Sequence, residues 1–173
     1  MELLTLSQIR GRVYRLAKVI AAPPGSLPSF GTVSELYIEV TGAGYHYVSW
    51  ERGHEFDRRT TRDVDELAYW IFETITSSMA WKFELPHRIP DQDCRRLAFE
   101  KQLDLLSNLS PEWAKRQEAE QREILRRHPF DDMARTRAIL CVHLRDQGHE
   151  GDVADALADE RFPPPIPEII EDE

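Results

Sequence analysis

The chain has 173 residues, which is enough for one domain with a real hydrophobic core. Hydrophobic residues make up 41% and charged residues 31%, a balance that argues against a wholly disordered chain. No apolar run approaches the roughly 20 residues that a membrane-spanning helix needs, and no signal-peptide pattern is evident at the first residues. We therefore expect a soluble, cytoplasmic protein that has no membrane partner.

The charge is acidic and concentrated near the end of the chain. The net charge is −9, and residues 159–173 alone hold six acids and one base, which is more than half of the acidic excess. Because an acidic surface repels phosphate groups, we expect no direct binding to DNA or RNA. The charge permits a basic partner.

The chain begins with a predicted amphipathic helix. Thr5 and Gln8 have the spacing of a capping box, in which each side chain bonds a backbone N–H at the helix start. Apolar positions then recur every three or four residues, at Ile9, Val13, Leu16 and Ile20. The helix is expected to end before Pro23, and residues 22–34 are expected to form a loop.

The next part of the chain predicts three antiparallel strands joined by short turns. Residues 35–41 alternate apolar and polar side chains, residues 45–50 carry three aromatic residues, and residues 54–59 carry one. Gly53 can take a positive φ at the end of the turn between the last two strands. A small sheet of this kind needs a helix against its apolar face.

The rest of the chain predicts helices. The segment from about 61 to 85 has the widest apolar stripe and is expected to pack centrally on the sheet. Further helices are expected over residues 90–107, 110–127, 130–148 and 152–159. Ser110 is the expected cap of the second of these, and Gly148 is a plausible C′ residue of the third. Ile139, Leu140 and Leu144 indicate that this third helix is buried on more than one side. The predicted fold class is therefore α+β, with an N-terminal helix, a three-stranded antiparallel meander, and four to five helices packed on one face of it.

The domain organisation is predicted to be simple. Residues 1–160 are expected to form one domain, and residues 161–173 an acidic, Pro-rich tail without order. Cys94 and Cys141 lie in predicted helices among apolar neighbours, so buried free thiols are favoured over a disulfide or a reactive thiol.

The sequence holds no strong signature of catalysis. The six histidines lack metal-ligand spacing, and the glycines form no phosphate-binding loop. A cluster of His46, His54 and Glu51 on neighbouring strands is the one enzyme hypothesis, and surface positions are favoured for both histidines. We therefore expect no enzymatic activity, no metal and no cofactor.

Aromatic and arginine residues on the strands have two interpretations. Tyr45 and Tyr47 share one face of their strand, Trp50 lies on the other face, and Phe56 is on the next strand. Packing in the core is favoured, with a protein-binding patch as the alternative. The arginines near residues 58–62 are expected to pair with acids rather than to form an anion site.

Five short motifs, in this order, resemble the immunity protein 63 family of bacterial polymorphic toxin systems. They are Tyr45-His46-Tyr47-Val48, Glu51-Arg52-Gly53, Asp65-Glu66-Leu67-Ala68-Tyr69-Trp70-Ile71, Arg88 with Gln92-Asp93-Cys94-Arg95-Arg96, and His128-Pro129-Phe130-Asp131-Asp132. The resemblance covers roughly residues 30–145. It implies a cytoplasmic antitoxin that binds a cognate toxin domain and neutralises it by steric occlusion, without enzymatic activity. A basic toxin such as a nuclease would suit the acidic charge.

The resemblance identifies residues that either hold the fold or contact the partner. These candidates are Tyr45, Tyr47, Trp50, Glu51, Arg52, Gly53, Arg88, Asp93, Arg95 and Arg96. A structural role is slightly favoured, in which Glu51 and Arg52 pair with the start of the third helix. The alternative function is a small non-enzymatic interaction or regulatory module unrelated to toxins. The sequence leaves open the identity of the toxin and the oligomeric state.

Overall fold

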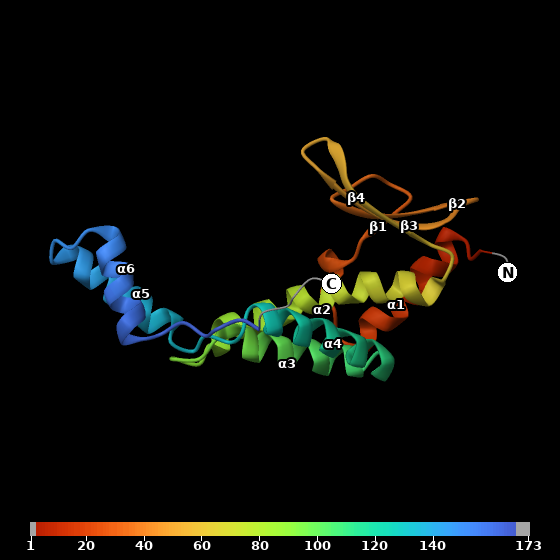
Figure 1. The fold of residues 1–173 in the computed structure, drawn as a ribbon. Helices are drawn as coiled ribbons and strands as arrows, with labels where there is room; N and C mark the ends of the chain where they lie inside the picture. The colour runs from red at the N-terminus through yellow and green to blue at the C-terminus, as the bar shows by residue number, and fades with distance from the viewer. Residues whose placement is uncertain (1–2, 169–173) are drawn as a thin grey trace.

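The structure is a computed structural model that describes residues 3–168 (Figure 1). Its elements, in order, are α1 (Leu6–Val19), the short helix η1 (Pro24–Ser26), β1 (Ser29–Phe30), β2 (Leu36–Thr41), β3 (Gly44–Glu51), β4 (His54–Thr61), α2 (Val64–His87), α3 (Cys94–Ser107), α4 (Pro111–Arg127), α5 (Ala134–Asp146) and α6 (Gly151–Arg161).

The fold class is α+β, as predicted, and the sheet has the order β1-β2-β3-β4. Strands β2, β3 and β4 form the predicted antiparallel meander. Strand β1 adds a short parallel pairing to β2, in a stretch that was expected to be loop. Two residues are too few to show an alternating pattern, so this strand depends on tertiary contacts such as the bond from Gly31 N–H to the Ile38 carbonyl, 2.8 Å.

Two glycines allow the strand turns. Arg52 and Gly53 have φ angles of 50° and 86°, and positive φ at both central residues is what a type I′ hairpin turn requires. Gly44 starts β3 with a φ of 150°, and a Cβ added there would lie 2.4 Å from the carbonyl oxygen of Thr61. The absence of a side chain at Gly44 therefore lets β3 and the end of β4 come together.

Helices α1 and α2 lie against one face of the sheet (Figure 1). The capping box of Thr5 and Gln8 is present at the start of α1. The Tyr45 hydroxyl accepts a hydrogen bond from the Leu4 N–H at 2.7 Å, and the Tyr47 hydroxyl donates to Thr74 at 3.2 Å. The shared core of these layers includes Ile9, Val13, Ile38, Leu67, Ile71, Phe72 and Ile75.

Helices α3 and α4 cover the other side of α2, so the prediction that the later helices pack on the sheet is wrong for them (Figure 1). Trp113 of α4 stacks on Phe72, with ring centroids 6.1 Å apart. The remaining inner positions of α4 are glutamines, and Gln121 donates to Gln102 of α3 at 3.1 Å. Because these inner side chains are polar, the buried face of α4 shows no apolar periodicity in the sequence.

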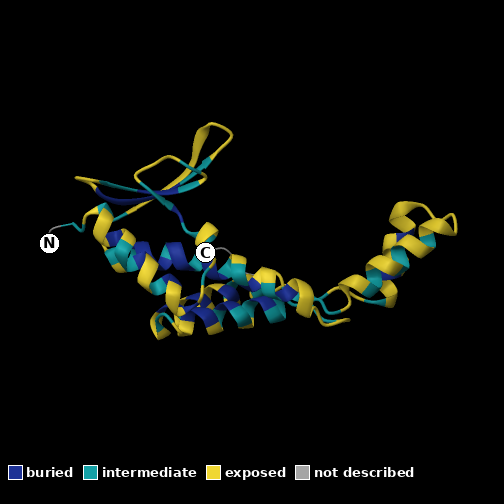
Figure 2. Cartoon of the chain, turned by 180° about the vertical axis from the view of Figure 1, so that it is seen from behind, coloured by how far each residue is buried: buried dark blue, intermediate teal, exposed yellow. Residues whose placement is uncertain are grey.

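Helices α5 and α6 form a two-helix arm that extends away from the other helices and the sheet (Figures 1 and 2). The arm begins at Ala134, later than predicted. After the last residue of α5, Asp146, and the cap residue Gln147, Gly148 takes a φ of 95° at the C′ position that the sequence predicted. The prediction that α5 is buried on more than one side is wrong, because none of its residues is buried and Ile139 is 60% exposed.

The segment after α6 runs back toward α4. Its described part, residues 162–168, has no regular secondary structure, and Glu168 pairs with Arg126 at 2.9 Å. Residues 169–173 of the predicted tail lie outside the described residues. Both cysteines are free thiols, as predicted, and each is only partly buried.

We expect Gly44→Ala to lower the free energy of unfolding by about 2 kcal/mol or more, because the added methyl group meets the Thr61 backbone. Gly25→Ala is the matched control, since no atom lies within 4 Å of a Cβ added there. Chemical denaturation measures both. Equal stability of the two variants would show that β3 and β4 do not approach so closely at Gly44.

We expect a chain that ends after Phe162 to remain folded. The Glu168–Arg126 pair lies at the surface, where such pairs contribute about 1 kcal/mol or less. Thermal unfolding followed by circular dichroism checks this. A loss of cooperative unfolding would mean that the tail is part of the domain.

Candidate functional site

The ten candidate residues lie in two separate places. Residues 45–53 belong to strand β3 and its hairpin, whereas Arg88, Asp93, Arg95 and Arg96 gather where α2 ends and α3 begins. The prediction that Glu51 and Arg52 pair with the third helix is wrong. Their ion pair is with each other at 3.5 Å, and both side chains are mostly exposed.

Asp93 is the centre of the second place. It caps α3 by accepting a hydrogen bond from the Arg95 N–H at 2.9 Å. Its carboxylate also binds the Arg95 guanidinium through two nitrogens, at 3.0 Å from Nε and 2.6 Å from Nη2. The Asp131 N–H donates to the same carboxylate at 2.9 Å. One carboxylate therefore joins the start of α3 to the connection between α4 and α5.

The environment of Asp93 favours its charged form. Burial opposes ionisation, but the hydrogen bonds from Arg95 and from the Asp131 N–H outweigh it and lower the pKa to about 2. Arg95 is held in turn by the backbone, because its two terminal nitrogens donate to the carbonyls of His128 and Pro129, each at 2.7 Å.

Arg96 makes a parallel connection with Asp132. Its guanidinium binds the Asp132 carboxylate through two hydrogen bonds of 2.9 and 3.0 Å, and Asp132 also accepts from the Asp93 N–H at 2.8 Å. The Arg96 guanidinium lies 4.1 Å from the centre of the Phe130 ring, within the range of a cation–π contact. We call Asp93, Arg95, Arg96, Asp131 and Asp132 the clasp.

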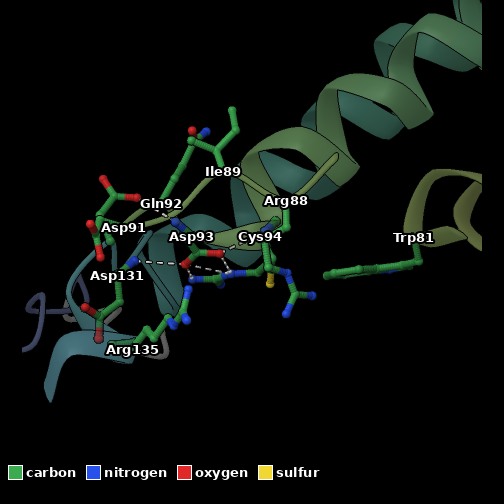
Figure 3. A pocket seen from close by; sticks show the side chains of 12 residues that line it. Trp81, Arg88, Ile89, Asp91, Gln92, Asp93, Cys94, Asp131 and Arg135 are labelled. Carbon is green, nitrogen blue, oxygen red and sulfur yellow. Dashed lines mark hydrogen bonds and ion pairs between the residues drawn. The ribbon is translucent and has the colours of Figure 1, made fainter. Parts of the chain in front are cut away.

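The clasp borders a hollow of about 540 Å³ at the end of α2 (Figure 3). Trp81, Arg88 and Ile89 line it from the α2 side, and Ala134 and Arg135 from α5. The buried carboxylate of Glu84 holds Arg88 at 2.7 Å, and this hydrogen bond lowers the Glu84 pKa. The hollow presents aromatic, aliphatic and guanidinium groups, whereas the clasp carboxylates are already paired with arginines.

This place also contains three acids that are not among the ten candidate residues: Asp131, Asp132 and Glu84. The first two were visible in the sequence as part of the His128–Asp132 motif, which occurs together with the Gln92–Arg96 motif. The sequence does not mark Glu84 as a site residue, because an acid four residues before an arginine is common on exposed helices.

The β3–β4 hairpin divides the aromatic candidates. Tyr45 and Tyr47 are buried against the helices, as core packing predicted. Trp50 is partly buried, and Phe56 is 71% exposed. Phe56 lies at a bulge in β4, because Ser49 pairs with Asp57 while Trp50 pairs with Glu55. The hairpin therefore presents an aromatic ring to solvent beside the exposed turn.

The histidine cluster that an enzyme would need is not formed. His46 is buried, and its two ring nitrogens lie 2.7 Å from Thr41 and 2.8 Å from Thr60. His54 pairs with Glu51 at the opposite end of the hairpin, about 20 Å from the Thr60 position along β4. Within residues 3–168, no group of three or more metal-binding side chains occurs, and no helix is long and apolar enough to cross a membrane.

We expect Asp93→Asn to lower the free energy of unfolding by about 2 kcal/mol at pH 7, which corresponds to the depressed pKa. A carboxylate whose pKa is lower in the folded state stabilises the fold at pH values above its unfolded-state pKa. The difference in unfolding free energy between wild type and variant should therefore reach its full value above pH 4 and shrink toward pH 2. Denaturation across this pH range measures it.

Asp63→Asn is the matched control for this prediction. Asp63 caps α2 in the same way, accepting from the Asp65 N–H at 2.8 Å, and no arginine pairs with it among the residues that the structure describes. Since Asn and Asp are similar caps, a change of about 0.5 kcal/mol or less is expected. Equal losses at the two caps would contradict the role assigned to the clasp.

Comparison with known proteins gives a match in the central part of the chain. No curated protein and no solved structure matches it. The family model described as immunity protein 63 matches residues 41–123, from the end of β2 to most of α4. The matched family, immunity protein 63, is the same family that the sequence motifs resemble.

Proposed function

We propose that this protein is a cytoplasmic immunity protein that binds a cognate toxin domain and neutralises it by steric occlusion, without catalysis. The observation that carries the proposal is the match of residues 41–123 to the immunity protein 63 model. The matched region includes both the exposed hairpin and the start of α3, so it contains all ten candidate residues.

The β3–β4 hairpin is the surface of this region that best fits partner contact. The clasp residues are occupied by contacts within the chain, and Tyr45 and Tyr47 are buried. In contrast, Arg52 is 86% exposed and Phe56 is 71% exposed. Aromatic and arginine side chains supply much of the binding energy of protein interfaces. We therefore assign toxin contact to the hairpin, centred on Arg52 and Phe56.

The charge of the chain supports a basic toxin. With a net charge of −9, the protein attracts a basic partner and accelerates its encounter, while contacts at the hairpin determine the lifetime of the complex. A nuclease domain is a toxin of this kind, because it carries basic groups for nucleic acid. This part of the proposal predicts an association rate that falls as salt rises.

The test is co-expression with a candidate toxin domain taken from a gene next to this one. Cells that contain the protein should survive, and Phe56→Ala and Arg52→Glu should each weaken toxin binding by about tenfold or more. Survival counts and calorimetry measure the two effects.

Leu85→Ala and Arg122→Glu are matched controls. Leu85 is 65% exposed on α2, and Arg122, like Arg52, is an exposed arginine beside a single acid, here Glu118 at 3.1 Å. Both controls should bind as the wild type does. Death of cells that contain the wild-type protein would overturn the proposed function, whereas normal binding by the hairpin variants would overturn only the assigned surface.

A further inference from the structure

One face of α5 carries a stripe that is exposed among the residues that the structure describes. Arg135, Ile139, Val142 and Asp146 follow one another at spacings of four, three and four residues, which places them on one side of the helix. Ile139 is 60% and Val142 57% exposed. Since helices in proteins gain most of their stability by burying an apolar face, this stripe indicates a missing contact.

The second helix of the arm does not supply that contact. It packs on α5 through other residues, with Ala154 and Ala158 buried and the Cys141 thiol 3.9 Å from the Ala154 carbonyl. Figures 1 and 2 show the arm extending from the other helices with mostly exposed surfaces. The other described residues of the single chain therefore leave the stripe exposed.

The two charged residues of the stripe are unusual for their positions. Arg135 lies in the first turn of α5 and Asp146 is its last residue, so both charges oppose the helix dipole. Within residues 3–168, neither takes part in an ion pair, whereas Arg137 and Arg145 of the same helix pair with Asp159 and Asp155 at 3.2 and 2.8 Å. Neither charge therefore has an oppositely charged partner within the described part of the chain.

We propose that two copies of this chain associate through an antiparallel contact between their α5 helices. If the two-fold axis passes midway between Ile139 and Val142, Ile139 of each copy faces Val142 of the other. The same axis places each Arg135 opposite the Asp146 of the other copy. The stripe is then complementary to itself, as a two-fold interface requires, and both charges gain a partner.

A second copy fits this stripe better than the toxin does. A basic toxin has no evident match to a stripe with one positive and one negative end, whereas an antiparallel copy reverses the order of the charges. The apolar centre also agrees with interfaces between identical subunits, which are more apolar than those of transient complexes. The stripe lies outside residues 41–123, the region that matches the family model, so this contact does not depend on the proposed toxin surface.

Sedimentation equilibrium and light scattering on the full chain test the proposal. We expect a species of twice the chain mass of 20.1 kDa. Arg135→Asp and Asp146→Arg should each raise the dissociation constant of the dimer by about tenfold or more, through repulsion across the axis. The double variant should restore association. Each substitution places a charge that the helix dipole favours, so circular dichroism should show α5 intact.

Val142→Asp and Val153→Asp form a second pair of variants. Val142 lies at the centre of the stripe, whereas Val153 is a 43% exposed valine on α6 outside it. The first should dissociate the dimer and the second should not. A monomer at every concentration overturns the proposal, and so does a dimer that Val142→Asp leaves intact or that the double charge exchange does not restore.

Discussion

The arrangement of the whole molecule depends on the burial of α2 on two opposite sides. Its side toward the sheet holds Tyr47 through Thr74, and its other side holds Trp113 through Phe72. α2 has 24 residues, with buried positions around much of its circumference, so one neighbouring layer cannot cover all of them. The chain therefore forms a sheet with α1 on one side and a helical pair, α3 and α4, on the other. Asp65 joins these layers, since it pairs with Arg12 of α1 at 2.7 Å and accepts from the Trp113 indole at 3.1 Å.

The clasp joins the start of α3 to the connection between α4 and α5. Charges taken out of water are costly unless paired and hydrogen-bonded, and Asp93 meets this condition with the Arg95 guanidinium and two backbone N–H groups. The motif residues at the start of α3 consequently serve to hold the connection between α4 and α5. The resemblance made Asp93, Arg95 and Arg96 candidates for either a structural role or partner contact, and in the structure all three side chains are paired within the chain.

These contacts leave two projecting parts of the molecule exposed, the β3–β4 hairpin and the arm of α5 and α6. The hairpin projects from the sheet because a type I′ turn at Arg52 and Gly53 keeps its strands paired beyond the helices. The arm projects at the other end because α5 packs on α6 and is joined to the clasp by Arg137 and Asp131. The proposed toxin contact and the proposed two-fold contact use different elements, so one does not block the other.

The sequence by itself determined the elements with local causes. The capping box of α1, the Gly53 turn, the cap at Ser110 and the apolar stripe of α2 all depend on neighbours within a few residues, and each was correctly predicted. Tertiary structure decided which layers meet. The inner face of α4 is made of Gln117 and Gln121, whose burial requires partners on another helix. The pairing of Asp93 with the segment near Asp131, rather than with Glu51 and Arg52, joins positions 38 residues apart. Pairing between distant positions cannot be predicted from neighbouring residues, because any acid could pair with any arginine in the chain. Which of them pair depends on which ones the fold brings close together.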